Sequence, residues 1–319
     1  MTKRRPEVVR VEGLAKDFRP GLGLRAKRVL DGITFSVHEN EIFGFVGPNG
    51  AGKTTTLKIL MGLIRPSGGS ARILGHDIRE SRFREHVGFL PEVSYFYDYL
   101  TGIEFLDFYA RLSNVPRAKR PDRIATLLGW VGLSHAGDAR LRTYSKGMLQ
   151  RIGIAQALIH DPQVVFLDEP MSGLDPLGRK EIRDLILRLR GDGKTVFMNT
   201  HILSDVEMVC DRVAIIVKGK IRYEGRIEDF IASDNQRADV VLARVPAELP
   251  ARLEDDLGAE LRPHGDQLEA RVHEKAINDV LRAALAAGAD VLSVTPVRVS
   301  LESIFLSAVG EPEARGEVR

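Results

Sequence analysis

The chain has 319 residues, and 44% of them are hydrophobic, which is enough for one large or two medium domains with their own cores. Because 46 Lys and Arg residues nearly balance 44 Asp and Glu residues, the net charge of +2 provides no bulk field for nucleic acid or an anionic membrane. We therefore expect no nucleic-acid partner. Cys210 is the single cysteine and cannot form an internal disulfide, so a reducing compartment is expected. Since the sequence has no apolar run of about 18 residues and no signal-like apolar region near its first residue, we expect neither an integral membrane protein nor a secreted one.

Short apolar runs alternate with helical patterns through about residue 230, which predicts strands connected by helices into a largely parallel sheet. The run from Glu41 to Val46 predicts a strand, and a glycine-rich turn follows it. A helix is expected next, because apolar residues recur at helical spacing at Leu57, Leu60, Met61 and Ile64.

The same alternation continues in the second half of this region. Asp175 followed by Pro176 is a favourable N-cap and first helical residue, and the helix they open is expected to end near Arg190. Further predicted elements are the strands Val164–Leu167 and Thr195–Asn199 and a hairpin that joins Val213–Val217 to Ile221–Tyr223.

Between residues 93 and 160 the strand patterns disappear, and we predict a helical subdomain inserted in the α/β core. Seven aromatic residues lie within fifteen positions of its first part. Such side chains either fill the core of the subdomain or form a surface on which a partner docks, and the sequence leaves both interpretations open. The seven are Tyr95, Phe96, Tyr97, Tyr99, Phe105, Phe108 and Tyr109.

A polar joint at residues 231–237 separates a first domain, expected at 1–233, from a second region with its own periodicity. The predicted elements of this region are strand 238–245, helix 249–257, strand 259–263, strand 267–272, helix 274–287 and strand 290–297. That βαββαβ order predicts a small ferredoxin-like α+β domain at 238–309. Its last helix is expected from Leu301 to Val309, and residues 310–319 are expected to form a tail.

The first motif with chemical meaning lies between a predicted strand and a predicted helix and satisfies G-x-x-x-x-G-K-[ST]. It reads Gly47, Pro48, Asn49, Gly50, Ala51, Gly52, Lys53, Thr54. Glycines let the backbone wrap closely around a phosphate, and the N–H groups and dipole of the following helix attract the anion. Lys53 is expected to reach the β and γ phosphates, and the hydroxyl of Thr54 is expected to ligate Mg²⁺. The sequence therefore predicts a site for a nucleoside triphosphate with Mg²⁺.

An acidic pair follows the second buried strand, at the end of a sheet where ligands of open α/β folds bind. Asp168 is expected to hold Mg²⁺ through water, and Glu169 is expected to act as the general base on the attacking water. His201 follows the strand Thr195–Asn199, so an imidazole there can contact the γ-phosphate and orient the water.

Together these motifs resemble the ATP-binding cassette (ABC) ATPases over about residues 7–230. Phe18 matches the adenine-stacking aromatic, and Gly47–Thr55 matches the Walker A loop, which adds Thr55 to the expected nucleotide-binding residues. Val164–Glu169 matches Walker B, Ser172–Asp175 matches the D-loop, and His201 matches the switch histidine. Tyr144–Met148 resembles the signature sequence that distinguishes this family from other phosphate-loop enzymes.

The resemblance assigns nucleotide contacts to Ser145 and Gly147 of that signature. The first, third and last residues of Tyr144–Met148 depart from the usual Leu-Ser-Gly-Gly-Gln, and Glu92 replaces the glutamine of the Q-loop. A carboxylate at Glu92 can still ligate Mg²⁺. Both departures are similar to those of the branch that serves exporters with separately encoded membrane subunits, in which a small domain also follows the cassette.

The resemblance implies a phosphate-loop (RecA-like) α/β core with antiparallel N-terminal strands and an inserted helical subdomain. It also implies an ATP-hydrolysing subunit that forms a head-to-tail homodimer and powers export through transmembrane permease subunits, at the cytoplasmic face of the membrane. The aromatic stretch near Glu92, with Tyr97 and Phe105, is the expected docking surface for the permease.

The alternative is a soluble ABC ATPase of translation or DNA repair. Translation-type members usually carry two cassettes in one chain, whereas this chain has one. Repair-type members have a long coiled coil between Walker A and Walker B, and here the segment between Lys53 and Asp168 has room only for the helical subdomain. For the C-terminal domain, dimer stabilisation and the binding of a regulatory ligand both remain possible roles.

Overall fold

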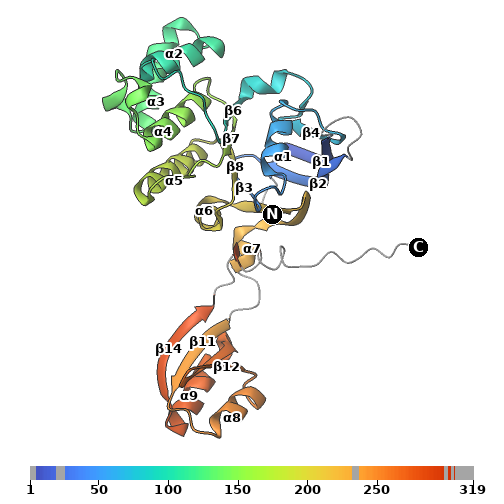
Figure 1. The fold of residues 1–319 in the computed structure, drawn as a ribbon, viewed down its shortest axis with the longest axis vertical. Helices are drawn as coiled ribbons and strands as arrows, with labels where there is room; N and C mark the ends of the chain where they lie inside the picture. Colours follow the sequence, from blue (N-terminus) through green and yellow to red (C-terminus); the bar gives the residue numbers. More distant parts are fainter. Residues whose placement is uncertain (1–4, 19–25, 232–236, 298–300, 303–304, 306–319) are drawn as a thin grey trace, which may run out of the picture. The chain divides into compact units, whose positions relative to one another are not determined.

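The structure, a computed structural model, describes residues 5–18, 26–231, 237–297, 301–302 and 305. The chain forms two compact units, one extending to Ile227 and the other from Glu228 to Ser307 (Figure 1). Each unit has a hydrophobic core of its own. The two are therefore described separately.

The first unit is built around a six-stranded, mostly parallel sheet (Figure 1). In sheet order its strands are β10 (Lys220–Arg226), β9 (Arg212–Val217), β3 (Ile42–Val46), β8 (Thr195–Thr200), β7 (Val164–Asp168) and β6 (Val87–Leu90). β10 is antiparallel to β9, as the hairpin pattern predicts, and the other neighbours are parallel. Every residue of β3, β7 and β8 is buried, as expected for central strands covered on both faces.

A second, antiparallel sheet packs against the first through an aromatic core. In sheet order its strands are β2 (Lys27–His38), β1 (Glu7–Phe18), β4 (Gly68–Ile73) and β5 (His76–Asp77). Phe35 of β2 contacts the rings of Phe43 and Phe45 on β3, with centroids 5.7 and 5.2 Å apart. Phe197 of β8 and Phe166 of β7 continue this cluster at 5.2 Å. The antiparallel N-terminal strands expected from the resemblance are therefore confirmed.

Three α-helices of the first unit connect or follow these strands: α1 (Lys53–Leu60), α5 (Pro176–Gly191) and α6 (Leu203–Val209). A short helix, α7 (Ile227–Ile231), begins at the last residue of this unit and continues into the sequence of the second. α1 ends at Leu60 because Gly62 adopts a left-handed φ of 66°. The expected extension of this helix to Ile64 is wrong, and Ile64 packs against the core from the following loop. α5 begins after the predicted N-cap Asp175, whose carboxylate accepts a backbone N–H hydrogen bond of 3.0 Å.

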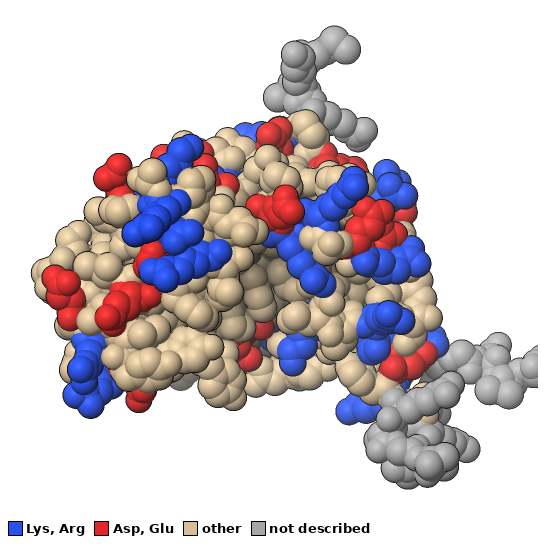
Figure 2. All heavy atoms as spheres, turned by 90° about the horizontal axis from the view of Figure 1, so that it is seen from above, with Lys and Arg blue, Asp and Glu red and all other residues tan. Residues whose placement is uncertain are grey.

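The segment between β6 and β7 is helical, as predicted. Its helices are α2 (Gly102–Leu112), α3 (Arg120–Trp130) and α4 (Lys146–Ala157), with short 3₁₀ turns at Arg117–Lys119, Ser134–Ala136 and Leu141–Thr143. Another 3₁₀ turn, Arg82–His86, precedes β6. Thr101 and Glu104 form a reciprocal capping box that starts α2. On the face of the first unit seen in Figure 2, basic and acidic side chains are interspersed over the coloured part of the surface.

The second unit is a four-stranded antiparallel sheet with two helices. In sheet order its strands are β12 (Glu260–His264), β13 (Gln267–His273), β11 (Arg237–Ala243) and β14 (Asp290–Val297). Its helices are α8 (Leu249–Asp255) and α9 (Ile277–Ala287), which share a core with alternate residues of β11 and β13 (Figure 1). This is the predicted βαββαβ order and a ferredoxin-like sheet.

Two details of the second unit differ from the prediction or lie beyond the description. The helix expected from 274 begins with a 3₁₀ turn, Glu274–Ala276, before α9. Of the helix expected at Leu301–Val309, the described residues 301, 302 and 305 are helical, and the others lie outside the described residues.

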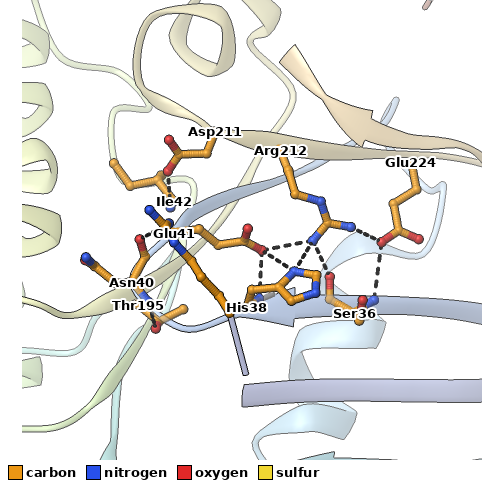
Figure 3. Close-up of polar contacts among 10 residues, drawn as sticks. Ser36, His38, Asn40, Glu41, Ile42, Thr195, Asp211, Arg212 and Glu224 are labelled. Carbon is orange, nitrogen blue, oxygen red and sulfur yellow. Dashed lines mark hydrogen bonds and ion pairs between the residues drawn. The ribbon is translucent and has the colours of Figure 1, made fainter. Parts of the chain in front are cut away.

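At the amino ends of β3 and β9, the partly buried Arg212 joins four segments of the first unit (Figure 3). The guanidinium of Arg212 donates to Glu41 at 3.0 Å and to Glu224 at 2.6 Å. It also donates to the carbonyl oxygen of Ser36 at 3.0 Å and to Nδ1 of His38 at 2.8 Å. Glu41 is 4% exposed, so this network supplies the partners that a buried carboxylate requires.

Candidate active site

The phosphate loop lies between β3 and α1. At each of its three glycines a side chain would be unfavourable, for a different reason at each position. A Cβ at Gly47 would overlap the carbonyl oxygen of Ile216. Gly52 has a φ of 111°, and a Cβ there would lie 2.5 Å from a methyl group of Leu30. Gly50, with a φ of 79°, has no neighbour within 4 Å of its Cβ position. The loop is therefore packed tightly against the protein on one side and open where Gly50 faces outward.

The first turn of α1 is free to receive an anion. Its N-cap, Gly52, supplies no side-chain hydrogen bond, and the first turn contains no acidic residue. The early N–H groups of a helix have no partner within the helix. Together with the helix dipole they form a site for a phosphate group, and Thr54 and Thr55 lie in this turn.

Lys53 is a buried cation beside this turn, with 7% of the residue exposed. Its ammonium donates to the carbonyl oxygen of Gly47 at 2.8 Å and lies 3.9 Å from a carboxylate oxygen of Glu169. Burial lowers the pKa of Lys53, and the negative charges of Glu169, Asp168 and Glu92 oppose this shift, in that order. One cation therefore faces three carboxylates.

Asp168 ends β7 and is 2% exposed. Burial raises its pKa to about 6, although the side-chain amide of Asn199 donates a hydrogen bond that acts in the opposite direction. The nearby charge of Glu92 adds to the increase in pKa. An opposite charge brought to this carboxylate would favour its ionised form, because a neighbouring cation stabilises a buried anion.

Glu169 has an unusual backbone, with a φ of 50° in the left-handed region. Its N–H donates to the carbonyl oxygen of Asn199 at 2.8 Å, and its carboxylate accepts from the hydroxyl of Thr200 at 3.3 Å. Non-glycine residues held in this conformation are costly and concentrate at functional sites. The turn directs a 7%-exposed carboxylate toward Lys53.

His201 completes the group from the end of β8. Its Nδ1 lies 2.9 Å from both carboxylate oxygens of Glu169. Because a carboxylate only accepts hydrogen bonds, this contact places a proton on Nδ1. The structure thus brings together Lys53, Asp168, Glu169 and His201, which the sequence predicted from three separate motifs.

The predicted Mg²⁺ ligands come from three elements: Thr54 in α1, Glu92 after β6, and Asp168 at the end of β7. The residues fit Mg²⁺, because the carboxylates outnumber Lys53 and the buried Oδ1 of Asn199 has no hydrogen-bond partner. Within the described residues no group of three or more His, Cys, Asp or Glu side chains could hold a metal ion. Mg²⁺ in nucleotide enzymes uses one or two carboxylates and takes further ligands from phosphates and water.

Ser145 and Gly147 lie at the start of α4. The Ser145 hydroxyl caps the helix by accepting from the N–H of Met148 at 3.2 Å. A Cβ at Gly147 would approach no atom closer than 3.9 Å, so packing within this chain does not require glycine there. No hydrogen bond or ion pair connects either residue to the phosphate loop in the described part of the chain. Lys53, Glu169 and His201 are therefore joined by close contacts, while Ser145 and Gly147 are not joined to them.

Two further positions complete the account of the predicted residues. Phe18 ends β1, is 41% exposed and has the ammonium of Lys16 5.0 Å from its ring centre. Tyr144, where the signature departs from leucine, is buried and donates its hydroxyl to the carbonyl oxygen of Ala136 at 2.7 Å. Burial raises the pKa of this hydroxyl. The departure at Tyr144 therefore serves the core of the helical segment.

Asn199 and Thr200 belong to the site, but the sequence analysis did not include them. Both end the strand that precedes His201, and that position was the available signal, because adjacent parallel strands end at the same edge of a sheet. Asn199 is fully buried and supports Asp168. Thr200 supports Glu169.

The aromatic stretch is divided between core and surface, so the core interpretation is confirmed for part of it, and docking on the exposed part stays a prediction. Phe105 is 1% exposed and belongs to the core, and its assignment to a docking surface is wrong. Tyr97, Tyr99 and Phe108 are exposed, and their rings are in contact, with centroids 6.1 Å apart for Tyr97 and Tyr99 and 5.4 Å apart for Tyr97 and Phe108. We call these three residues the aromatic patch.

The comparisons with known proteins agree with this geometry. The profile of the family described as ABC transporter matches residues 30–172. An uncharacterized ABC transporter ATP-binding protein of Synechocystis is 42% identical over 95% of this chain and 85% of its own length. The daunorubicin/doxorubicin resistance ATP-binding protein DrrA of Streptomyces peucetius is 33% identical over 89% of each chain.

A solved structure, described as the ATP binding subunit of an ABC transporter, is 30% identical and has a TM-score of 0.62. It covers 70% of this chain and 91% of its own length. These relatives favour the transporter interpretation over the soluble alternative. Within the described residues, no helix is both long enough and apolar enough to cross a membrane. The chain belongs to the ABC transporter family and is an ATP-binding subunit of that family.

Proposed function

We propose that the chain hydrolyses Mg²⁺-ATP to power export through separate transmembrane subunits, as a homodimer bound peripherally at the cytoplasmic face of the membrane. The observation that carries this proposal is the buried Lys53, which faces Asp168, Glu169 and Glu92 at the open side of a phosphate loop. The name of DrrA, a drug-resistance protein, supports export as the direction.

In this proposal the phosphates of ATP bind to the first turn of α1 and to Lys53, which then exchanges its contact with Gly47 for a phosphate oxygen. Thr54, Asp168 and Glu92 hold Mg²⁺, which supplies positive charge to the phosphates when bound. Phe18 offers an exposed ring for the adenine.

Glu169 acts as the general base and accepts a proton from the water that attacks the γ-phosphate. Thr200 and His201 hold its carboxylate in place through hydrogen bonds. His201 remains 45% exposed at its side chain, so it can also contact the bound phosphate. Rigid support of this kind orients a base without further reorganisation during the reaction.

Ser145 and Gly147 are proposed to act across the dimer. Each lies at the start of α4, where a capped but open helix end can receive an anion. The partner subunit's Ser145 and Gly147 would then contact the γ-phosphate held by Lys53 of the first copy. ATP would favour the closed pair, and hydrolysis would release it.

The aromatic patch is the proposed contact for the transmembrane subunits. Exposed, mutually packed aromatic rings are typical of binding surfaces. The patch begins at Tyr97, five residues after Glu92 in the chain, and we propose that nucleotide state is transmitted along this segment. We also propose that residues 1–233 form the nucleotide-binding domain, with the helical subdomain at 93–160, and that 238–309 is an accessory domain.

The test is affinity purification of the tagged Glu169→Gln chain from detergent-solubilised native membranes with Mg²⁺ and ATP. We expect a polytopic membrane protein to co-purify, and Tyr97→Ala with Phe108→Ala should reduce its yield. Leu63→Ala, at another exposed apolar residue of the first unit, is the matched control. Recovery of only soluble proteins or ribosomes would overturn the role in transport.

A further inference from the structure

Asp205 is a buried carboxylate that takes no part in the proposed chemistry. It lies in the first turn of α6 and is 4% exposed. Among the described residues, Arg179 is the side chain that donates a hydrogen bond to it, from the guanidinium to Oδ2 at 3.1 Å. Burial raises the pKa of Asp205, and the charge of Arg179 opposes this shift. The pair is therefore a largely buried ion pair outside the phosphate site.

Arg179 comes from the helix that follows the D-loop segment Ser172–Asp175. It is the fourth residue of α5, and its N–H donates to the carbonyl oxygen of Asp175 at 2.9 Å. Because the carboxylate of Asp175 caps the same turn at Gly178, the backbone at Arg179 is fixed. α5 and α6 pack against each other and lie on the same side of the six-stranded sheet (Figure 1). The ion pair therefore joins the start of α5 to the start of α6.

The start of α6 also sets the position of His201. Three residues lie between His201 and Asp205, and the N–H of Ile202 donates to the hydroxyl of Thr200 at 3.1 Å. The side chain of His201 is 45% exposed, so packing alone does not hold it in place. Its position depends on the contact of Nδ1 with Glu169 on one side and on the backbone that leads into α6 on the other.

Apolar packing holds α6 against β3, whereas a polar contact joins it to α5. Val206 is fully buried, and a Cβ at Gly44 of β3 would lie 2.9 Å from one of its methyl groups. Toward α5, Asp205 faces Arg179. A buried ion pair adds little stability over apolar side chains of similar volume, but its hydrogen bond fixes distance and direction. The pair is therefore suited to positioning rather than to stabilisation.

We propose that Arg179 and Asp205 are positioning residues for ATP hydrolysis. Their ion pair fixes the start of α6 and so holds the imidazole of His201 against Glu169. This role rests on the proposed function for the chemistry of Glu169 and His201, and it adds two residues that act through His201 rather than on the nucleotide. A displaced imidazole orients the base less well, and small misplacements of catalytic groups cost rate. ATP binding is not affected, because Lys53 and the phosphate loop lie outside this contact.

Steady-state ATP hydrolysis by the full chain tests this role. Arg179→Met removes the cation and keeps a side chain of similar length. We expect kcat to fall about 10- to 100-fold and KM for ATP to change less than about 2-fold, because the phosphate loop is unaltered. Lys180→Met removes the adjacent, exposed cation of α5 and is the matched control, for which we expect the parent kcat. An unchanged kcat in Arg179→Met would overturn the proposal.

A second variant separates positioning from stability, because Arg179→Met alone leaves Asp205 buried without its cation. Combining Arg179→Met with Asp205→Leu replaces the pair by apolar side chains, a change that is often neutral for stability. We expect circular dichroism to show the parent fold and kcat to remain low, because the directional contact is missing. Recovery of the parent kcat in this double variant would show that the pair only stabilises the fold and would refute the positioning role.

The same double variant in a His201→Ala chain shows whether the pair acts through the imidazole. If it does, removing the pair lowers the kcat of His201→Ala no further, because residues that act as a unit are not additive. A further fall of about 10-fold or more would mean an independent route and would contradict the proposal.

Glu169→Gln, measured alongside, separates this inference from the proposed function. Hydrolysis by Glu169→Gln at the parent rate would refute the proposed chemistry itself. Slow hydrolysis by Glu169→Gln together with the parent kcat in both variants of the ion pair would refute the positioning role alone.

Discussion

At the amino ends of β3 and β9, the guanidinium of Arg212 faces the carboxylates of Glu41 and Glu224 and donates to each of them. At the carboxyl ends of β3, β7 and β8, the ammonium of Lys53 faces three carboxylates, and the buried Asp168 has a raised pKa. Each cluster contains buried charge: Glu41 in the first, and Lys53, Asp168 and Glu169 in the second. The first has one cation for two carboxylates, and each carboxylate accepts a hydrogen bond from that cation, whereas the second has one cation for three carboxylates, a larger excess of negative charge that an external cation can balance. The difference indicates which end is structural and which binds a ligand.

Backbone geometry does not separate the two ends. Glu169 at the carboxyl end and Asn40 at the amino end are both left-handed, with φ of 50° and 54°, and among the described residues Asn199 and Asn40 each have a buried side-chain oxygen without a hydrogen-bond partner. The two ends therefore differ in how their charges are paired rather than in backbone strain. Arg212 combines its ion pairs with a position 5.5 Å from the ring centre of Phe43. Its charge therefore contributes to packing as well as to pairing.

At the carboxyl end, Lys53→Ala should weaken nucleotide binding. A hydrogen bond to a charged group contributes about 1.5 to 3 kcal/mol, so ATP affinity is expected to fall on the order of 10- to 100-fold, measured by calorimetric titration with Mg²⁺-ATP. Lys58→Ala, an exposed lysine of the same helix, is the control and should bind ATP normally. Unchanged affinity in Lys53→Ala would place the phosphates elsewhere.

Arg212→Met should lower stability and leave the chemistry intact. Removing one partner of a buried ion pair costs about 3 to 5 kcal/mol, because Glu41 is left buried without its cation. Urea unfolding followed by the fluorescence of Trp130 reports on the first unit alone, since it is the single tryptophan. Arg10→Met, which removes an exposed pair with Glu12, should cost about 1 kcal/mol or less. Equal costs for the two variants would contradict a structural role for the amino end.

The smallest expected effect is a pH dependence in the second unit. The guanidinium of Arg271 donates to Asp239 at 2.7 and 2.9 Å and lowers the pKa of that carboxyl. Because the folded pKa is depressed, the contribution is present above the unfolded pKa of about 3.9 and is lost as pH falls through the folded value. Its size is about 1 kcal/mol or less, since the pair is partly exposed.

Hydrogen exchange of β11 as a function of pH measures this effect. Protection of β11 in the parent chain should decrease as pH falls below about 4, and Asp239→Asn should remove part of that decrease. An identical pH profile in the parent chain and in Asp239→Asn would show that the pair contributes nothing. In that case charge pairing would contribute to stability in the first unit but not at Asp239 in the second.

Much of the site could be predicted from sequence because its motifs are local. The loop at Gly47–Thr54 carries its spacing and its glycines within eight residues, and Asp168 and Glu169 directly follow a recognisable strand. The contributions of Asn199 and Thr200 depend on the pairing of β7 with β8, which is non-local. Sequence pattern alone does not specify which residues face each other across two strands.

The fold was predictable to a similar extent and for a similar reason. Alternating strands and helices gave the α/β class, and the βαββαβ pattern gave the second unit. The division of the aromatic stretch was not predictable, because the buried position of Phe105 and the exposed position of Phe108 depend on which face of α2 packs inward. The end of α1 depended on the left-handed conformation of Gly62.

The most direct test of the account is single-turnover ATP hydrolysis by Glu169→Gln at saturating Mg²⁺-ATP. The amide keeps the size of the side chain but cannot serve as a base, so we expect the rate to fall about 10²- to 10⁴-fold while ATP binding is retained. If Glu169→Gln binds ATP and hydrolyses it at the parent rate, this result would contradict the assignment of Glu169 as the base and of catalysis to the carboxyl ends of the sheet.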